Sequence, residues 1–210
     1  MLKCFATSEK GAAMVEAAIA MTLLFLLTLG FVDFGNAFYQ WNAADKAVQY
    51  GARLASISDP VATGLAAAAP TTTPGAPVVA GAYAPFVCSY TAGVGSCSSG
   101  GFSATSFSRI FRGDTSFSDS DDCPIRTGSQ RPGMCHFFPF LTRANVVVTY
   151  SATGLGYQTR QGGPVPTITV RLRNVNFQFF FLSGLLGFGN IAMPSMLSTV
   201  TGEDMKSTAP

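Results

Sequence analysis

The sequence predicts an α+β protein, with a long N-terminal transmembrane and amphipathic helix packed against a small antiparallel β-sheet domain with disulfide-braced loops. Three observations predict this class. Residues 17–32 form an uninterrupted apolar run. Short β-branched runs typical of strands follow later in the chain. Four of the five cysteines also follow the apolar run, in a region rich in Gly and Ser.

The apolar run is long enough to cross a bilayer. Between residues 11 and 32 the only charged side chain is Glu16, and residues 12–32 approach the roughly 20 residues that a span requires. Lys3 and Lys10 precede the run, whereas no basic residue follows it until Lys46. Because positive charge stays on the cytoplasmic side, we expect a single-pass protein with its N-terminus in the cytoplasm and its C-terminal domain exported.

Three processing outcomes are open for this segment. A secretory signal peptide could be cut near the small residues 35–37, an uncleaved signal anchor would keep the whole chain, and a third route cuts after Gly11. Glu16 favours the third route. It would become the fifth mature residue, where the new amine and the positive end of the helix dipole stabilise a carboxylate. The alternative is a glutamate that reaches the membrane interface near Lys10.

Residues 10–16, KGAAMVE, followed by the apolar run, resemble a type IV prepilin signature: a basic leader ending in Gly, then Glu at mature position five. The stretch continues with DFG at 33–35 and GAR at 51–53. In this order the motifs resemble the TadE/TadG-like family of tight-adherence (Flp) pilus assembly. The chain is too long for a major pilin of this type, and Ala17 replaces the Tyr usual there.

This resemblance implies a minor pilin or pseudopilin, a structural component at the base or tip of a tight-adherence pilus. It implies cleavage by a prepilin peptidase between Gly11 and Ala12, with Glu16 helping to set register against a neighbouring subunit. The implied partners are other pilins, pilus assembly proteins, the prepilin peptidase and the bacterial inner membrane. Incorporation into an extracellular pilus is a further expectation.

The helix is predicted to continue beyond the membrane. Apolar residues recur at intervals of three and four and form one stripe, which ends near Pro60: Phe34, Phe38, Trp41, Ala44, Val48, Ala52 and Ala55. We expect this stripe to pack on the chain's own β domain, on a filament neighbour, or on both. Phe34, Phe38 and Trp41 are its candidate packing residues next to the membrane.

The cysteines divide into one before the apolar run, Cys4, and an even set after it, Cys88, Cys97, Cys123 and Cys135. An even set beyond a membrane span predicts disulfides in an oxidising compartment. Three connectivities are possible. Pairing Cys88 with Cys97 and Cys123 with Cys135 is favoured because short loops cost least to close. Free buried thiols are the alternative, and the spacing does not suit structural zinc.

We expect four regions: a leader at 1–11, the helix at 12–58, an Ala/Pro/Thr/Gly-rich linker at 59–87, and an exported β-rich domain at 88–210. Strands are predicted at 144–150, 167–172, 174–181 and 195–201. Residues 177–188 are too short and too rich in Gly for a second membrane span. Sheet core or a subunit contact is expected there instead.

No catalytic set can be assembled from the sequence, so we expect no enzyme and no cofactor. His136 is the only histidine, and a structural role is expected for it. Asp114, Asp119, Asp121 and Asp122 form an acidic cluster, for which calcium is the alternative to a solvated loop. A near-zero net charge without a basic patch argues against nucleic acid as a partner. The alternative function is a permanently anchored adhesin or assembly-factor binding module, and an exported enzyme is a third.

Overall fold

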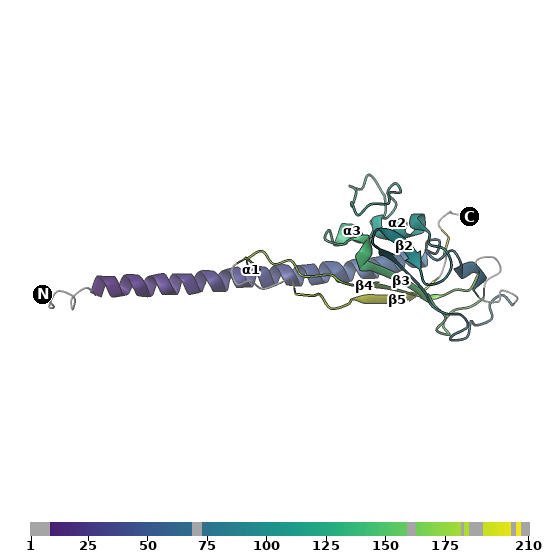
Figure 1. The fold of residues 1–210 in the computed structure, drawn as a ribbon, viewed down its shortest axis with the longest axis horizontal. Coiled ribbons are helices and arrows are strands. Elements are labelled where there is room, and N and C mark those ends of the chain that lie inside the picture. Colours follow the sequence, from purple (N-terminus) through teal and green to yellow (C-terminus); the bar gives the residue numbers. More distant parts are fainter. Residues whose placement is uncertain are drawn as a thin grey trace. The chain divides into compact units, whose positions relative to one another are not determined.

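The computed structural model describes residues 9–68, 73–158, 163–181, 183–184, 191–202 and 205–206. The chain forms two compact units. Unit 1 contains Met1–Gln40 and Asn176–Ile191, and unit 2 contains Trp41–Val175 and Ala192–Pro210. Helix α1 (Glu9–Ser56) supplies its first part to unit 1 and its last part to unit 2 (Figure 1). Most of the predicted leader, residues 1–8, lies outside the described residues.

Unit 2 is built on a five-stranded antiparallel sheet with the order β2-β1-β3-β4-β5. The strands are β1 (Phe86–Thr91), β2 (Val94–Cys97), β3 (Val146–Ser151), β4 (Thr167–Leu172) and β5 (Leu197–Thr201). β3 lies at the centre, and its side chains at 146–148 and 150 are all buried. The α+β class, with one long helix and a small antiparallel sheet, is therefore confirmed.

Three predicted strands are present with small changes at their ends. β4 has the predicted bounds, β3 begins at Val146 because Arg143–Asn145 form a 3₁₀ turn, and β5 begins at Leu197. The fourth prediction, a strand at 174–181, is wrong. The structure has no strand at 174–181, and residues 178–181 instead bind α1 in unit 1.

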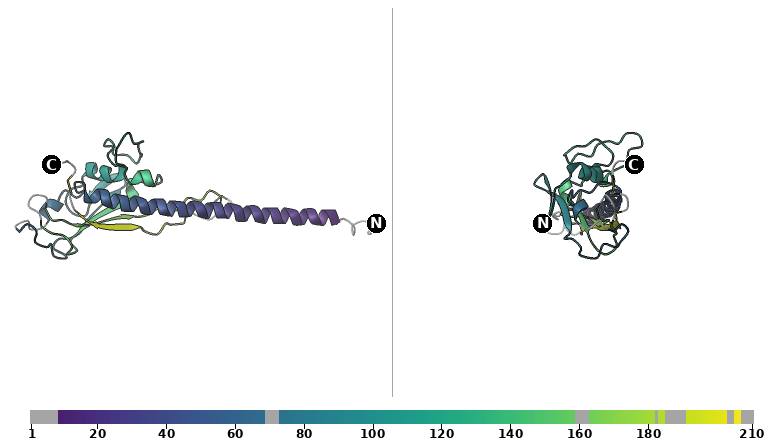
Figure 2. Two further views of the ribbon diagram at one scale, coloured as in Figure 1. Left: turned by 180° about the vertical axis from the view of Figure 1, so that it is seen from behind. Right: turned by 90° about the vertical axis from the view of Figure 1, so that its right-hand side faces the viewer.

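The last part of α1 lies alongside the sheet (Figures 1 and 2). Its buried face consists mostly of small residues, namely Ala43, Ala44, Ala47, Val48, Gly51, Ala52 and Ala55. Small side chains let other elements approach the helix closely. At Gly51 an added Cβ would lie 2.5 Å from the Met134 sulfur, and the Tyr50 and Phe137 rings lie 4.9 Å apart. The outer half of the predicted apolar stripe is therefore buried on the chain's own domain.

Residues 88–135 contain more regular structure than the Gly/Ser-rich sequence suggested. Besides β1 and β2, they form helix α2 (Ala104–Arg112) and the start of helix α3 (Met134–Phe137). Ser103 caps α2 by accepting a hydrogen bond from the Ser106 N–H. Two disulfides join Cys88 to Cys97 and Cys123 to Cys135, which are the pairs that short loops favour. The predicted disulfide-braced loops are thus present.

The segment predicted as a linker contributes to the core. Val61, Ala62 and Leu65 are buried, and the backbone N–H of Val61 donates to the hydroxyl of Tyr150 over 2.9 Å. Tyr150 is fully buried, and this burial raises the pKa of its hydroxyl. One hydrogen bond therefore ties the chain after α1 to the central strand.

Replacing Tyr150 by Phe is expected to lower the free energy of unfolding by about 1–3 kcal/mol, because the buried Val61 N–H loses its acceptor. The same variant should also change how the free energy of unfolding depends on pH in the alkaline range. A tyrosine with a raised folded-state pKa stabilises the fold fully below its unfolded pKa of about 10 and loses that contribution as pH rises through the folded value. Between pH 10 and 12, urea titrations should give a shallower loss of stability for the variant. Tyr83 and Tyr90, whose pKa values burial raises to about 12, supply the remaining slope. An unchanged slope would contradict the assignment.

Candidate functional site

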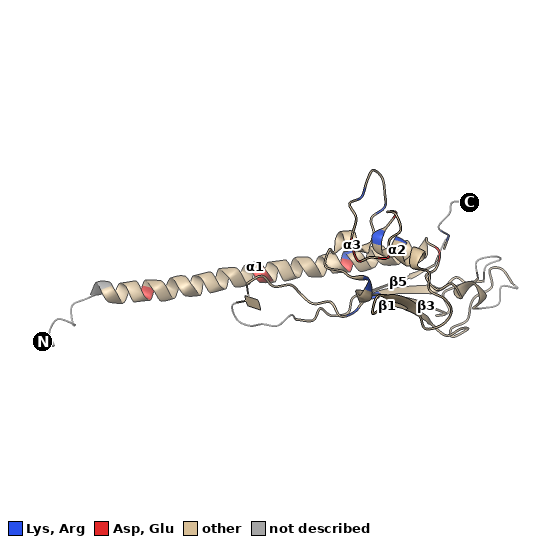
Figure 3. Ribbon diagram, turned by 45° about the horizontal axis from the view of Figure 1, so that its top comes forward, with Lys and Arg blue, Asp and Glu red and all other residues tan. Residues whose placement is uncertain are grey.

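The first part of α1 has an apolar surface that the described chain does not cover. It is long and apolar enough to cross a membrane, and none of its most apolar 18-residue window is buried. Figure 3 shows few charged residues along this stretch, and Glu16 is the only one between residues 11 and 32. Residues 12–32 span about 31 Å at 1.5 Å per residue, close to the roughly 30 Å of hydrocarbon in a bilayer. This helix indicates single-pass membrane anchoring.

The predicted processing residues lie in this exposed stretch. Gly11, Ala12 and Glu16 are all helical and exposed. Glu16 lies just over one helical turn beyond Gly11. Cleavage after Gly11 stays a prediction, and so does the contact between Glu16 and a neighbouring subunit.

A polar face of α1 begins where the apolar run ends, and it holds the segment 178–181. The carboxylate of Asp33 accepts hydrogen bonds from the backbone N–H groups of Phe180 and Phe181, both over 2.9 Å. The Gln40 amide donates to the Gln178 carbonyl over 2.8 Å and accepts from the Gln178 N–H over 2.9 Å.

Asn36 lies between these two residues and donates to the same Gln178 carbonyl over 3.0 Å. Three side chains on one helix face thus bind the backbone of this segment. Asp33 and Gln40 are 0% and 1% exposed. A carboxylate buried to this extent needs such donors, because burial of an unpaired charge is costly.

Within the chain, the membrane-proximal part of the predicted stripe is exposed and the polar face is buried. Near the membrane, Phe34 and Phe38 are 65% and 71% exposed, and Trp41 is 39% exposed. The buried positions are instead Asp33 and Gln40, because the groups packed there are backbone amides and carbonyls, which require polar partners. Whether Phe34, Phe38 and Trp41 contact a filament neighbour stays a prediction.

Sequence reasoning missed the polar face, although a signal was present. Asp33, Asn36 and Gln40 recur at three- and four-residue spacing directly after the apolar run, which places them on one side of a helix. The periodicity of apolar residues alone does not reveal these three polar residues. Of the predicted sheet core or subunit contact at 177–188, residues 182 and 185–188 lie outside the described residues.

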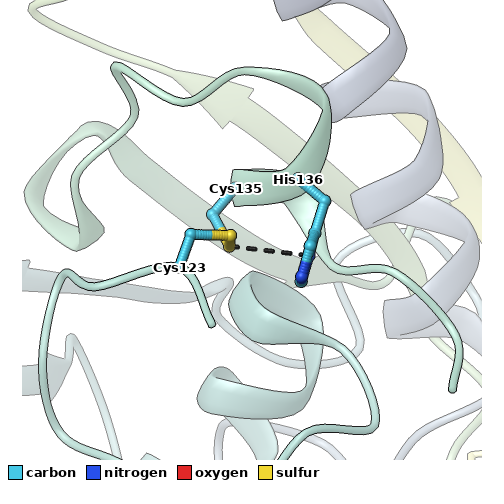
Figure 4. Close-up of side chains that lie close together, drawn as sticks. All are labelled: Cys123, Cys135 and His136. Atoms are coloured by element: carbon cyan, nitrogen blue, oxygen red, sulfur yellow. Dashed lines mark hydrogen bonds between the residues drawn. A yellow bond between two sulfur atoms is a disulfide. The ribbon is translucent and has the colours of Figure 1, made fainter. Parts of the chain in front are cut away.

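His136 lies beside the second disulfide (Figure 4). Its Nδ1 accepts a hydrogen bond from the Gly133 N–H over 3.0 Å and lies 3.6 Å from the Cys135 sulfur. Its Nε2 lies 2.9 Å from the Pro124 carbonyl, so Nε2 carries the proton. Cys123, Cys135 and His136 are close enough to share a metal ion. The two sulfurs are bonded to each other, however, and both ring nitrogens have partners, so this cluster braces loops.

The acidic cluster is divided between arginines. Asp114 forms a two-pronged ion pair with Arg131, with distances of 2.7 and 3.1 Å, and this hydrogen bonding lowers the pKa of Asp114. Asp119 and Asp121 both bind Arg143, which lies over the Tyr90 ring at 4.5 Å. The carboxylates of Asp114, Asp119 and Asp121 therefore fasten loops to the domain through arginines, and this pairing does not favour calcium at these three residues.

Comparison with known proteins gave one match to a protein family. Residues 11–53 match the model of the family described as TadE-like protein. A comparison with curated proteins found no match. A comparison with solved structures also found no match. The matched range starts at the predicted cleavage residue and ends at Arg53, in the last turn of α1. The part of α1 that carries the apolar run and the polar face is thus similar to TadE-like proteins.

Proposed function

We propose that this protein is a minor pilin or pseudopilin, a structural component of tight-adherence pilus biogenesis at the pilus base or tip. The observation that carries the proposal is the coincidence of the TadE-like match with α1. Its apolar surface is uncovered by the described chain, so lipid or neighbouring helices must cover it. A helix first inserted in a membrane and then packed in a filament meets both environments.

The same helix supports the proposed placement and partners. The N-terminus lies in the cytoplasm, the sheet domain is exported from the bacterial inner membrane, and two disulfides suit that oxidising side. Other pilins, pilus assembly proteins and the prepilin peptidase are the partners. The chain itself has no catalytic activity. The engagement of both His136 nitrogens by the chain's own groups supports this view.

The deciding experiment is N-terminal sequencing and intact mass of the protein from its native membrane, with and without the prepilin peptidase. We expect a mature chain that starts at Ala12 only when the peptidase is present. Gly11→Leu should leave the chain uncut. Glu16→Gln should be cut normally but be lost from the sheared pilus fraction, because the charge that sets register is gone. Glu9→Gln is the matched control, since it removes a carboxylate from the discarded leader.

A chain that starts at Met1 in both strains would contradict the pilin route. It would favour the permanently anchored adhesin or assembly-factor module, in which Glu16 has no partner amine. Normal recovery of Glu16→Gln in the pilus fraction would contradict the register role alone.

A further inference from the structure

The segment 178–181 is held at a defined depth relative to the membrane. Asp33 is the first residue after the apolar run, so it lies at the outer edge of the hydrocarbon when residues 12–32 fill the bilayer. The N–H groups of Phe180 and Phe181 bind directly to its carboxylate. These two phenylalanines therefore lie at the same edge.

The direction of the segment is also fixed within unit 1 (Figure 1). Gln178 binds Gln40, and Phe180 binds Asp33, which lies about 10 Å closer to the membrane along the helix axis. The chain thus descends from Gln178 toward the bilayer. The Ile191 carbonyl accepts a hydrogen bond from the Phe177 N–H over 2.9 Å. The backbone at Ile191 therefore lies beside the backbone at Phe177.

The side chains at this end are apolar, exposed and uncharged. Phe180 is 65% exposed, Phe181 41% and Ile191 51%. From Asn174 to Gly202 the sequence contains no charged residue, and the nearby Asp33 is buried against two amides. Adjacent apolar side chains left in water mark a contact surface. Phe side chains on membrane-surface segments are typically buried at the boundary between the headgroups and the acyl chains.

We propose that Phe180 and Phe181 insert among the phospholipids of the outer leaflet, so that α1 and this segment form a two-point attachment to the same membrane. The occupant is the lipid just beneath the headgroups. Continuity with the membrane-spanning helix, matched depth and the absence of charge all select lipid. The attachment fixes the depth of unit 1 in the bilayer. It requires α1 to cross the membrane but not a role in a pilus.

The test uses the full chain, alone, in vesicles of phosphatidylethanolamine and phosphatidylglycerol. The photo-crosslinking residue p-benzoylphenylalanine replaces Phe180 in one sample and Phe117 in another. Phe117 is a matched control because it is 54% exposed but lies between Asp114 and Asp119, whose charge does not favour insertion among lipids. After illumination, intact mass should show an adduct of one phospholipid on the position 180 variant. The position 117 variant should carry much less of this adduct.

A second replacement at Phe181 guards against misfolding at position 180, and intact disulfides in each sample show that unit 2 is folded. Lipid adducts at 180 or 181 above the Phe117 level support the proposal. A crosslinked dimer at 180 and 181 in place of the lipid adduct would overturn it in favour of a second copy of the chain. Adduct levels at 180 and 181 no higher than those at position 117 would overturn the proposal and would mean that both side chains face water.

Discussion

Replacing Asp33 by Ala is expected to release the segment 178–181 from α1. Two backbone N–H groups lose their acceptor at once, and each buried unsatisfied donor costs about 1–3 kcal/mol. The free energy of local opening should therefore fall by about 2–6 kcal/mol. Hydrogen exchange measures such opening residue by residue. Asp33→Asn should show about half of the effect, because one carbonyl oxygen still accepts.

The amide of Gln178 distinguishes release of the segment from simple loss of two bonds. Its hydrogen bond goes to Gln40, not to Asp33, so it exchanges faster only when the whole segment opens. Asp45→Ala is the matched control on the same helix. Asp45 accepts a single exposed hydrogen bond from Gln49, and its loss should cost no more than about 0.5 kcal/mol. Unchanged exchange at Gln178 in Asp33→Ala would contradict the role assigned to Asp33.

Replacing Gly133 by Ala is expected to destabilise unit 2 by about 3 kcal/mol, near the upper end for overpacked sites. An added Cβ would lie 2.5 Å from the Arg112 carbonyl carbon and would overlap backbone atoms of Phe111 and Gly113. Backbone atoms at the end of α2 cannot move aside as a flexible side chain can. The next residues, Met134 and Cys135, are buried, so the strain should spread to the disulfide loop.

Urea unfolding of the full chain in detergent checks this prediction. Gly35→Ala is the control of opposite sign, since its added Cβ meets no atom within 4 Å. There, the better helix propensity of Ala should stabilise the chain by up to about 1 kcal/mol. Equal stabilities for the two variants would show that the contact between residues 111–113 and Gly133 is not tight.

Local patterns predicted much of this architecture. Uninterrupted apolar residues specify a membrane helix whatever follows them, and β-branched runs at 144–150 and 167–172 specified the two central antiparallel strands to within two residues. Short spacing between Cys88 and Cys97 favoured a local disulfide, which a two-residue turn between β1 and β2 then aligns. These features depend on neighbours in sequence.

Other features depend on partners distant in sequence. The run at 174–181 has a strand-like composition, yet it forms no strand. Its binding to α1 and the burial of Asp33 depend on a contact between residues 147 positions apart. His136 likewise received its structural role from Gly133 and Pro124.

The sequence by itself therefore determined a membrane helix, a small β domain and a set of cysteines able to brace it. Only the tertiary structure decided that the helix turns a polar face to the phenylalanine-rich segment 178–181. The physical reason is that periodicity shows which residues share a face, whereas a buried carboxylate or amide is stable only where the folded chain brings it a hydrogen-bond partner.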